Sequence, residues 1–215
     1  MRVSDDRYTR DRNKLDLAWR LIHHEARTFT IRQWTGLSDD RIRKLYRSYC
    51  LERGREAVLR HRGKSPRQAA YFFASTERSF HAVQLASIFM TYGLLVFEDH
   101  GVQSRFRLGS LEAGATLCAA FETYHRLHHP CLISFEHAFS LLLALARHEV
   151  TLTRCGSCDG MRLHDLFPRQ GASCVNCSST SAVGFPQDRL PCSRNLLPPR
   201  SKLGVSDRTA VCLPS

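Results

Sequence analysis

The N-terminal part of the chain repeats apolar residues at the spacing of a helix. Between residues 12 and 29, successive apolar positions are three or four residues apart, at Leu15, Ala18, Ile22, Ala26 and Phe29. This spacing places the side chains on one face, which is typical of an amphipathic helix packed against a core. The pattern therefore predicts a helix over residues 12–29.

Two shorter helices are expected directly after it, separated by a turn. The first covers residues 30–35, and Gly36 supplies the turn. The second covers residues 38–49, where Ser38 is a suitable N-cap because its hydroxyl can accept a hydrogen bond from a free backbone N–H. The two aspartates that follow suit the positive end of the helix dipole. Three helices joined this closely are typical of a helix-turn-helix motif.

The middle of the chain contains three further helical patterns. One runs over residues 75–92 and ends at Gly93. The next opens at Ser110, and the last opens at Ser134 with the acidic Glu136 in its first turn. Almost no segment before residue 150 alternates between apolar and polar residues as strands do, so we expect a mainly α fold.

The composition changes after residue 150. Cysteine and glycine become dense, and segments such as 161–166 are short enough to pair as a small hairpin. Beyond residue 178 the chain is rich in proline, serine and arginine and lacks a periodic apolar pattern, which predicts a flexible, disordered tail. The expected organisation is a basic helical segment over 1–64, a helical core over 65–150 that packs with it as one domain, a cysteine-rich module over 151–178 and a tail over 179–215.

The charge of the chain is positive and unevenly distributed. Lysine and arginine number 31 against 20 aspartate and glutamate residues, which gives a net charge of +11 and an isoelectric point near 9.6. Residues 1–64 contain 17 basic and 9 acidic side chains and so contribute 8 of these charges. A localised surplus favours a polyanionic partner, with nucleic acid ahead of an anionic membrane surface.

The longest stretch without a charged side chain covers residues 79–97 and approaches the length of a membrane span. Serine, histidine, glutamine and threonine interrupt it, so we expect a buried core helix and no membrane segment. The N-terminus lacks the apolar region of a secretory signal. The expected location is therefore the cytoplasm, where the reducing environment disfavours a disulfide framework and favours metal binding by grouped cysteines.

Two C-x2-C pairs separated by 15 residues are the most specific motif in the chain. They contain Cys155, Cys158, Cys174 and Cys177. This spacing is typical of structural zinc sites, because each pair supplies two thiolates from one tight turn and the loop between them brings the pairs together. Four thiolates complete the tetrahedral shell of one Zn²⁺ ion and leave no position for water, so residues 151–178 are expected to be a structural zinc-binding module. His164 is an alternative ligand, and a redox switch that releases zinc is an alternative role.

The predicted helix-turn-helix supplies both an apolar core and a basic surface. Its apolar positions are Ile31, Leu37, Ile42 and Leu45, and the basic side chains expected beside the polar first turn at Ser38 are Arg41, Arg43, Lys44 and Arg47. A helix of this kind fits the major groove of DNA, where basic groups reach phosphates or guanine edges. Arg32 and Thr35 are expected to contact the DNA backbone from the preceding helix. An ordinary three-helix turn with a solvated basic face is the alternative.

Together these segments resemble the flagellar transcriptional activator subunit FlhC. The resemblance rests on Leu37-Ser-Asp-Asp-Arg41-Ile-Arg-Lys-Leu45-Tyr46, on Gly63-Lys-Ser-Pro-Arg67 and on the order of these motifs before the four cysteines, over residues 14–178. The chain departs from the family at Gln68 and Tyr71, where the family has glycine and proline, in added residues around 51–62 and 99–109, and in a longer tail. These departures are typical of a divergent paralogue.

The resemblance implies a non-enzymatic DNA-binding subunit. Family members assemble with the small helical subunit FlhD into a hetero-hexamer and activate flagellar promoters together with RNA polymerase. The family's zinc ligands correspond to the four cysteines named above. We therefore expect promoter DNA, an FlhD-like subunit and RNA polymerase as partners.

Two other classes of function are alternatives. One is a zinc-ribbon protein that binds RNA, or a redox-switched regulatory protein. The other is a hydrolase or transferase, but the sequence contains no phosphate-binding glycine loop, no nucleophile elbow and no H-E-x-x-H motif. A DNA-binding activator subunit without enzyme activity is the preferred interpretation.

Overall fold

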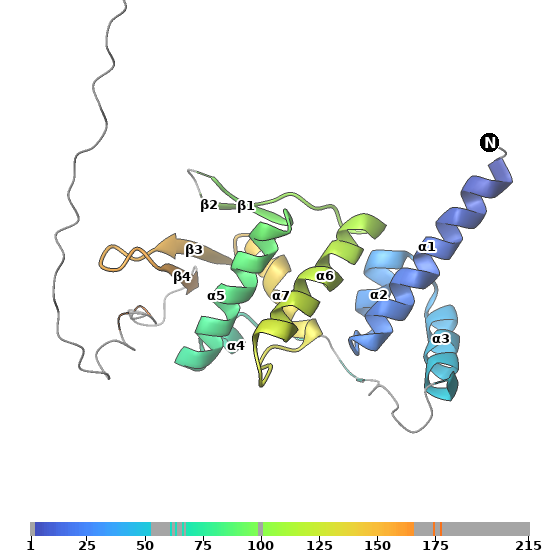
Figure 1. Cartoon of the computed structure of the whole chain (residues 1–215), viewed down its shortest axis with the longest axis horizontal. Helices are drawn as coiled ribbons and strands as arrows, with labels where there is room; N and C mark the ends of the chain where they lie inside the picture. The colour runs from blue at the N-terminus through green and yellow to red at the C-terminus, as the bar shows by residue number, and fades with distance from the viewer. Residues whose placement is uncertain are drawn as a thin grey trace, which may run out of the picture. The chain divides into compact units, whose positions relative to one another are not determined.

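The computed structural model describes residues 3–52, 68–98 and 101–165, together with residues 61, 63, 66, 174 and 177. By its internal contacts the chain divides into two units, Met1–Val183 and Gly184–Ser215. The predicted tail over 179–215 lies outside the described residues, as does most of the segment expected to follow the third helix. The described part of the chain is mainly α, as predicted, with seven helices and two β-hairpins (Figure 1).

The first three helices each contact the other two, and a turn joins the second to the third, so residues 28–52 are called the helix-turn-helix below. The three helices are α1 (Val3–His23), α2 (Thr28–Thr35) and α3 (Asp39–Glu52) (Figure 1). Gly36 connects α2 to α3 with a left-handed backbone (φ +66°), which glycine adopts without steric cost. The N–H of Gly36 donates to the carbonyl of Arg32 at 2.9 Å and so closes α2.

The end of α1 differs from the prediction of one continuous helix over residues 12–29. The helix ends at His23, and Glu25 adopts a left-handed conformation (φ +59°). The N–H of Ala26 donates to the carbonyl of Leu21 at 3.0 Å, so that the last turn of α1 is capped by the chain that follows it. Glycine usually occupies the left-handed position of such a turn, and its absence here is why the sequence pattern gave the wrong boundary.

The helices of the middle segment begin where the sequence predicts. They are α5 (Thr76–Thr91), α6 (Leu111–Leu127) and α7 (Phe135–Ala146), each capped by the serine before it, whose side chain accepts a hydrogen bond from the backbone N–H three residues on. A short helix, α4 (Ala70–Phe73), precedes α5 and was not predicted. In the described part of the chain, no helix has both the length and the apolar character that crossing a bilayer requires.

Two short antiparallel hairpins complete the fold. Strands β1 (Leu95–Glu98) and β2 (Gly101–Ser104) pair with Leu95 opposite Ser104, which contradicts the expectation of almost no strand before residue 150. Four residues per strand are too few to show an alternating pattern in the sequence. Strands β3 (Val150–Arg154) and β4 (Met161–Asp165) form the second hairpin, so the pairing expected for residues 161–166 is confirmed.

Among the described residues, one hydrophobic cluster includes side chains from both the helices and the hairpins. It includes buried residues from Leu17 on α1 to Leu163 on β4. At Gly114 the backbone of α6 lies so close to α1 and α2 that a Cβ there would be 2.8 Å from Leu17 Cδ2 and 3.3 Å from Trp34 Cε3. A glycine at this position therefore lets α6 pack directly on the helix-turn-helix.

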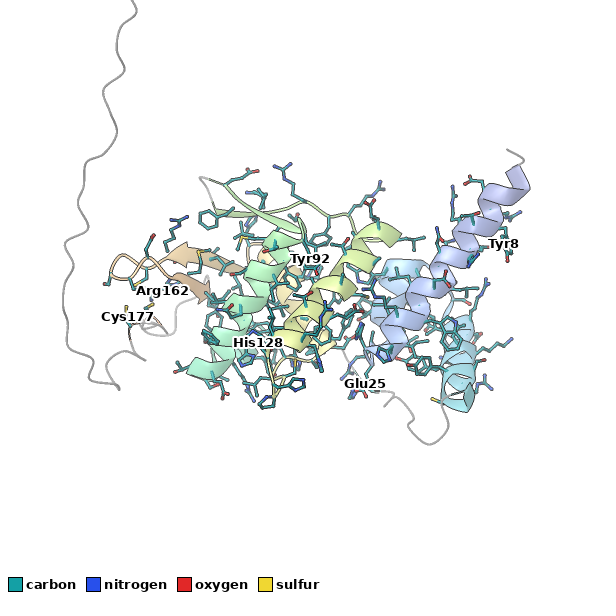
Figure 2. The ribbon with its side chains drawn as sticks, in the orientation of Figure 1. Tyr8, Glu25, Tyr92, His128, Arg162 and Cys177 are labelled. Carbon is teal, nitrogen blue, oxygen red and sulfur yellow. The ribbon has the colours of Figure 1, made fainter. Side chains whose placement is uncertain are left out.

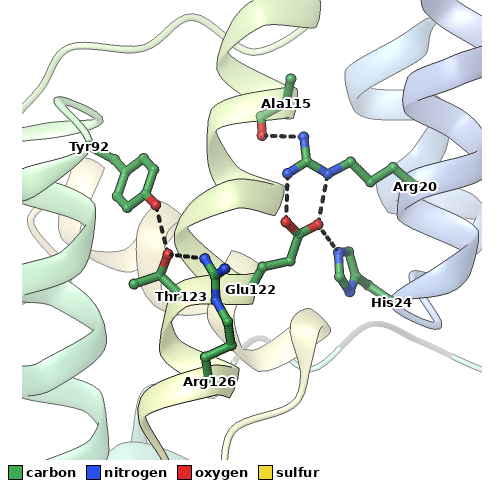
Figure 3. Close-up of polar contacts among 7 residues, drawn as sticks. All are labelled: Arg20, His24, Tyr92, Ala115, Glu122, Thr123 and Arg126. Carbon is green, nitrogen blue, oxygen red and sulfur yellow. Dashed lines mark hydrogen bonds and ion pairs between the residues drawn. The ribbon is translucent and has the colours of Figure 1, made fainter.

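A half-buried ion network also links α1 to α6 (Figure 3). Arg20 donates through Nε and Nη2 to the two carboxylate oxygens of Glu122, each at 2.8 Å, and through Nη1 to the carbonyl of Ala115 at 3.2 Å. Nε2 of His24 lies 2.9 Å from the same carboxylate. The hydrogen bond from Arg20 is the main reason that the pKa of Glu122 falls to about 2.

We expect Glu122→Gln to destabilise the protein by about 1–2 kcal/mol at pH 7, because the bidentate pair is only partly screened by solvent. The pKa of Glu122 is lowered from 4.5 to about 2 on folding, so its contribution is present above pH 4.5 and is lost as the pH falls towards 2. Urea unfolding at pH 7 and pH 3 measures both effects. Glu98→Gln, which breaks an exposed single contact to Arg105, is the control and should change stability by less than about 0.5 kcal/mol. If both variants lost the same free energy of unfolding, the Arg20–Glu122 network would not stabilise the protein more than an exposed ion pair does.

Candidate metal centre and basic helical face

The turn between β3 and β4 places the first cysteine pair at the tip of the hairpin. Cys155 directly follows β3, and its N–H donates to the carbonyl of Gly160 at 2.8 Å. The carbonyl of Cys155 in turn accepts from the N–H of Asp159 at 2.9 Å, and Asp159 has a left-handed backbone (φ +57°). This tight turn brings the side chains of Cys155 and Cys158 to one side.

The second pair lies close to the first, and Figure 2 shows Cys177 beside the β3–β4 hairpin. Sγ of Cys155 lies 3.9 Å from Sγ of Cys177, and Sγ of Cys158 lies 3.5 Å from Sγ of Cys174. All four sulfur atoms lie within 4.8 Å of one another. In a tetrahedral site with four Zn–S bonds of about 2.3 Å, the sulfur atoms are about 3.8 Å apart. The four cysteines are therefore close enough together to hold one shared metal ion.

The environment of the sulfurs lowers the pKa of Cys155 and raises the pKa of Cys158 and Cys177. Backbone N–H groups of Ser157 and Cys158 lower the pKa of Cys155 to about 6. Hydrogen bonding with Cys158 and Cys174 raises the pKa of Cys177 to about 12. A metal ion would replace the remaining thiol protons and offset the repulsion among thiolates, so metal binding at this cluster releases protons.

The donor set consists of sulfur alone. Among the described residues, the group of side chains close enough to share an ion contains the four cysteines and no histidine. His164, the alternative ligand, lies on β4 opposite Thr151 and is outside this group. Four sulfur donors leave no open coordination position, so a bound ion would organise structure rather than activate water.

The apolar residues predicted for the helix-turn-helix lie in its core. Ile31 and Ile42 are fully buried, Leu37 is nearly so, and Leu45 packs against the same cluster. Tyr46 adds a contact that the pattern did not reveal, because its hydroxyl donates to the carbonyl of Ala26 in the loop after α1. The orientation of α3 is therefore fixed from its buried side.

The outer side of α3 carries exposed cations. Arg43 is held by Asp40 at 2.7 Å, and Arg32 of α2 is held by Asp39 at 3.4 Å. Arg41, Lys44 and Arg47 are exposed, and within the described residues none of them forms an ion pair. We call these three residues the basic face. The acidic first turn of α3 therefore neutralises two of the predicted DNA-contacting cations and leaves three available.

The structure corrects the role expected for Thr35. The side chain is buried, with 3% exposed, and its hydroxyl donates to the carbonyl of Ile31 at 2.7 Å while accepting from the N–H of Leu37 at 3.2 Å. The hydroxyl holds the turn together and is not presented to DNA. Ser38 is exposed, and its hydroxyl lies 3.4 Å from the N–H of Arg41 as the N-cap of α3.

Sequence reasoning missed two further groups. The Arg20–Glu122 pair joins residues about a hundred positions apart, and no local pattern indicates it. Glu136 was expected only as an acidic residue in the first turn of α7, but it is buried and accepts a hydrogen bond from the backbone N–H of Arg27 at 2.7 Å. It therefore caps the start of α2 from a distant helix. The one available signal was its place in an otherwise apolar segment.

Comparison with known proteins adds nothing to these observations. The sequence matches no family model and no curated protein. The resemblance to FlhC consequently rests on the motifs in the sequence alone.

We expect Cys174→Ser to reduce bound metal from about one ion per chain to less than 0.1, since one of only four ligands is lost. Elemental analysis of the purified protein by mass spectrometry measures the ratio and identifies the metal. Cys50→Ser, near the end of α3 and outside the cluster, is the control and should retain the ion. Full metal content in the Cys174 variant would rule out the four-cysteine site.

We expect Thr35→Val to lower the free energy of unfolding by about 1–2 kcal/mol, because the buried N–H of Leu37 loses its acceptor. Thr30→Val on the same helix is the matched control. Thr30 is also fully buried, but within the described structure its hydroxyl has no hydrogen-bond partner, so valine should be neutral or stabilising there. Chemical denaturation of both variants decides whether the turn depends on the Thr35 hydroxyl.

Proposed function

We propose that this protein is a DNA-binding transcriptional activator subunit with a structural zinc ion and no enzyme activity, similar to the FlhC family. The observation that carries the proposal is the basic face on α3. Arg41, Lys44 and Arg47 project from the second helix of a helix-turn-helix whose opposite side is buried in the core. In such motifs, this helix is the one that enters the major groove.

The spacing of the basic face suits a nucleic-acid backbone. Its three residues are each three positions apart, so they rise by about 4.5 Å per step along the helix and cover one broad side of it. Cations without a protein partner can exchange their solvent ions for phosphates, and the counterions that DNA then releases favour binding. Arg32 and Arg43 can join only at the expense of their contacts to Asp39 and Asp40.

Zinc is the metal that best fits the four sulfur donors. Thiolate groups in a tetrahedral arrangement are typical of structural zinc sites. Leu152 and Leu163, on the two strands of the hairpin, belong to the main hydrophobic cluster. An ion at the hairpin tip would thus connect Cys174 and Cys177 to a hairpin that already packs in the core. Its role is to hold the C-terminal module in place.

The resemblance supports the wider assembly. A small helical subunit like FlhD would complete a hetero-hexamer, which would contact RNA polymerase at a promoter in the cytoplasm. Flagellar genes are the targets that the family implies, although the departures of this chain from the family leave room for a different set of genes.

The test of DNA binding is the double variant Arg41→Ala and Lys44→Ala. We expect it to weaken binding to duplex DNA and to reduce the slope of log K against log salt by about 1.8, which is about 0.9 for each lost phosphate contact. Fluorescence anisotropy between 50 and 300 mM salt gives both quantities, and metal content and thermal melting confirm that the variant is folded.

The control removes the same charge elsewhere. It is the double variant Arg105→Ala and Arg107→Ala. Both residues lie after β2 and outside the helix-turn-helix. This variant should keep the wild-type slope within about 0.3. If both double variants lost the same DNA affinity and salt slope, the net charge of the protein, and not the position of the basic face, would determine DNA binding. Preferential binding of single-stranded RNA over duplex DNA at the same salt would favour the RNA-binding alternative.

A further inference from the structure

An acidic side chain lies among the cations on the exposed side of α3. Asp40 belongs to the first turn of the helix, and its side chain is 83% exposed. Lys44 follows it by four positions and Arg47 by seven, so the carboxylate and both cations lie along one side of the helix. A carboxylate at this place repels the phosphates that the basic face attracts. Binding to the DNA backbone alone therefore gives Asp40 no role.

The buried side chains of α3 define which residues point away from the protein. Ile42 and Tyr46 are buried in the core. An α-helix turns by about 100° per residue, so Asp40 and Lys44, each two positions from Ile42, lie about 160° around the helix from it. Arg47 lies about 140° from Ile42. Asp40, Lys44 and Arg47 therefore form the middle of the exposed side.

Three other charged residues of α3 lie nearer the core. Arg41 and Arg43 are each one position from Ile42 and lie about 100° from it in opposite directions. Asp39 lies about 60° from Ile42, and its side chain is 41% exposed. In a recognition helix, the residues that face the major groove, those of the N-terminal part above all, contact base edges, and residues at the sides reach phosphates. Asp40 is thus placed toward the bases, and Asp39 is not.

Arg43 holds the carboxylate of Asp40 in position. Its Nη1 donates to Oδ1 of Asp40 at 2.7 Å. An ionised carboxylate can accept about four hydrogen bonds, so it can accept another one while it keeps this contact. The positive charge of Arg43 also offsets the repulsion between the carboxylate and nearby phosphates. Asp40 can therefore enter a DNA groove as a positioned hydrogen-bond acceptor.

The base edges differ in what they offer to such an acceptor. In the major groove, guanine presents the acceptors N7 and O6, and thymine presents the acceptor O4. Adenine presents an amino donor beside its N7 acceptor, whereas cytosine presents its N4 amino donor. We infer that Asp40 sets the base preference of the helix-turn-helix by accepting a hydrogen bond from the N4 amino group of a cytosine in the major groove. This inference rests on the proposed DNA-binding function.

The two aspartates of the first turn provide a matched pair of variants. Asp40→Asn removes one negative charge and releases Arg43, so it should bind duplexes of arbitrary sequence more tightly than the wild-type protein does. Its amide group presents a donor as well as an acceptor, which suits adenine better than cytosine, so the cytosine preference should be lost. Asp39→Asn removes the same charge and releases Arg32, so it should also bind more tightly but keep the cytosine preference.

The experiment measures affinity and base preference separately with the full-length protein. Selection from duplexes with a random central segment, followed by sequencing, identifies the bound sequence. Fluorescence anisotropy then compares duplexes that carry each of the four bases at each enriched position. The wild-type protein should prefer cytosine at one position by at least about fivefold, and Asp40→Asn should reduce this preference to less than about twofold. Asp40→Ala should lose it as well, and thermal melting and metal content confirm that each variant is folded.

The outcomes distinguish this inference from the proposed function. Retention of the cytosine preference in folded Asp40→Asn or Asp40→Ala, or an equal loss of it in Asp39→Asn, would overturn the inference. Salt-dependent duplex binding by the wild-type protein without a cytosine preference would also overturn it, while the proposed DNA binding would stand. If the wild-type protein shows no salt-dependent duplex binding, the proposed function fails and the inference fails with it.

Discussion

The packing of α6 against α1 and α2 at Gly114 is the constraint on which the rest of the structure depends. No side chain larger than hydrogen fits there without displacing Leu17 or the Trp34 ring. The Arg20–Glu122 pair adds a directional contact between α1 and α6. These contacts join the helix-turn-helix to the helical core through one continuous apolar cluster. With its inner side fixed in this way, α3 presents its basic face to solvent.

The cysteine cluster and the helix-turn-helix are stabilised by different interactions. The helix-turn-helix is held by buried apolar side chains and by the hydroxyls of Thr35 and Tyr46. At the hairpin tip, four sulfur atoms converge beside a turn, residues 155–160, whose other side chains are glycine, serine and aspartate, so an ion would supply there the stabilisation that a core supplies elsewhere. In the proposed function, the helix-turn-helix binds DNA and the cysteine cluster supports the structure.

Local chemistry made much of this fold predictable, and long-range contacts account for what was missed. Ser75, Ser110 and Ser134 mark three helix starts because capping involves only the next turn. The cysteine spacing indicated the cluster because metal ligation demands specific residue types at specific separations. In contrast, the buried role of Thr35 and the capping of α2 by Glu136 depend on how distant helices meet. The β1–β2 hairpin was missed because its strands are too short to show a pattern.

The salt dependence of duplex DNA binding by the native protein tests the central claim most directly. If Arg41, Lys44 and Arg47 each displace one counterion, the slope of log K against log salt is at least about 2.7 in magnitude. A slope of that size or steeper, reached with DNA in preference to single-stranded RNA, agrees with the basic face as the binding surface. A slope near zero, measured with folded and metal-loaded protein, would contradict it.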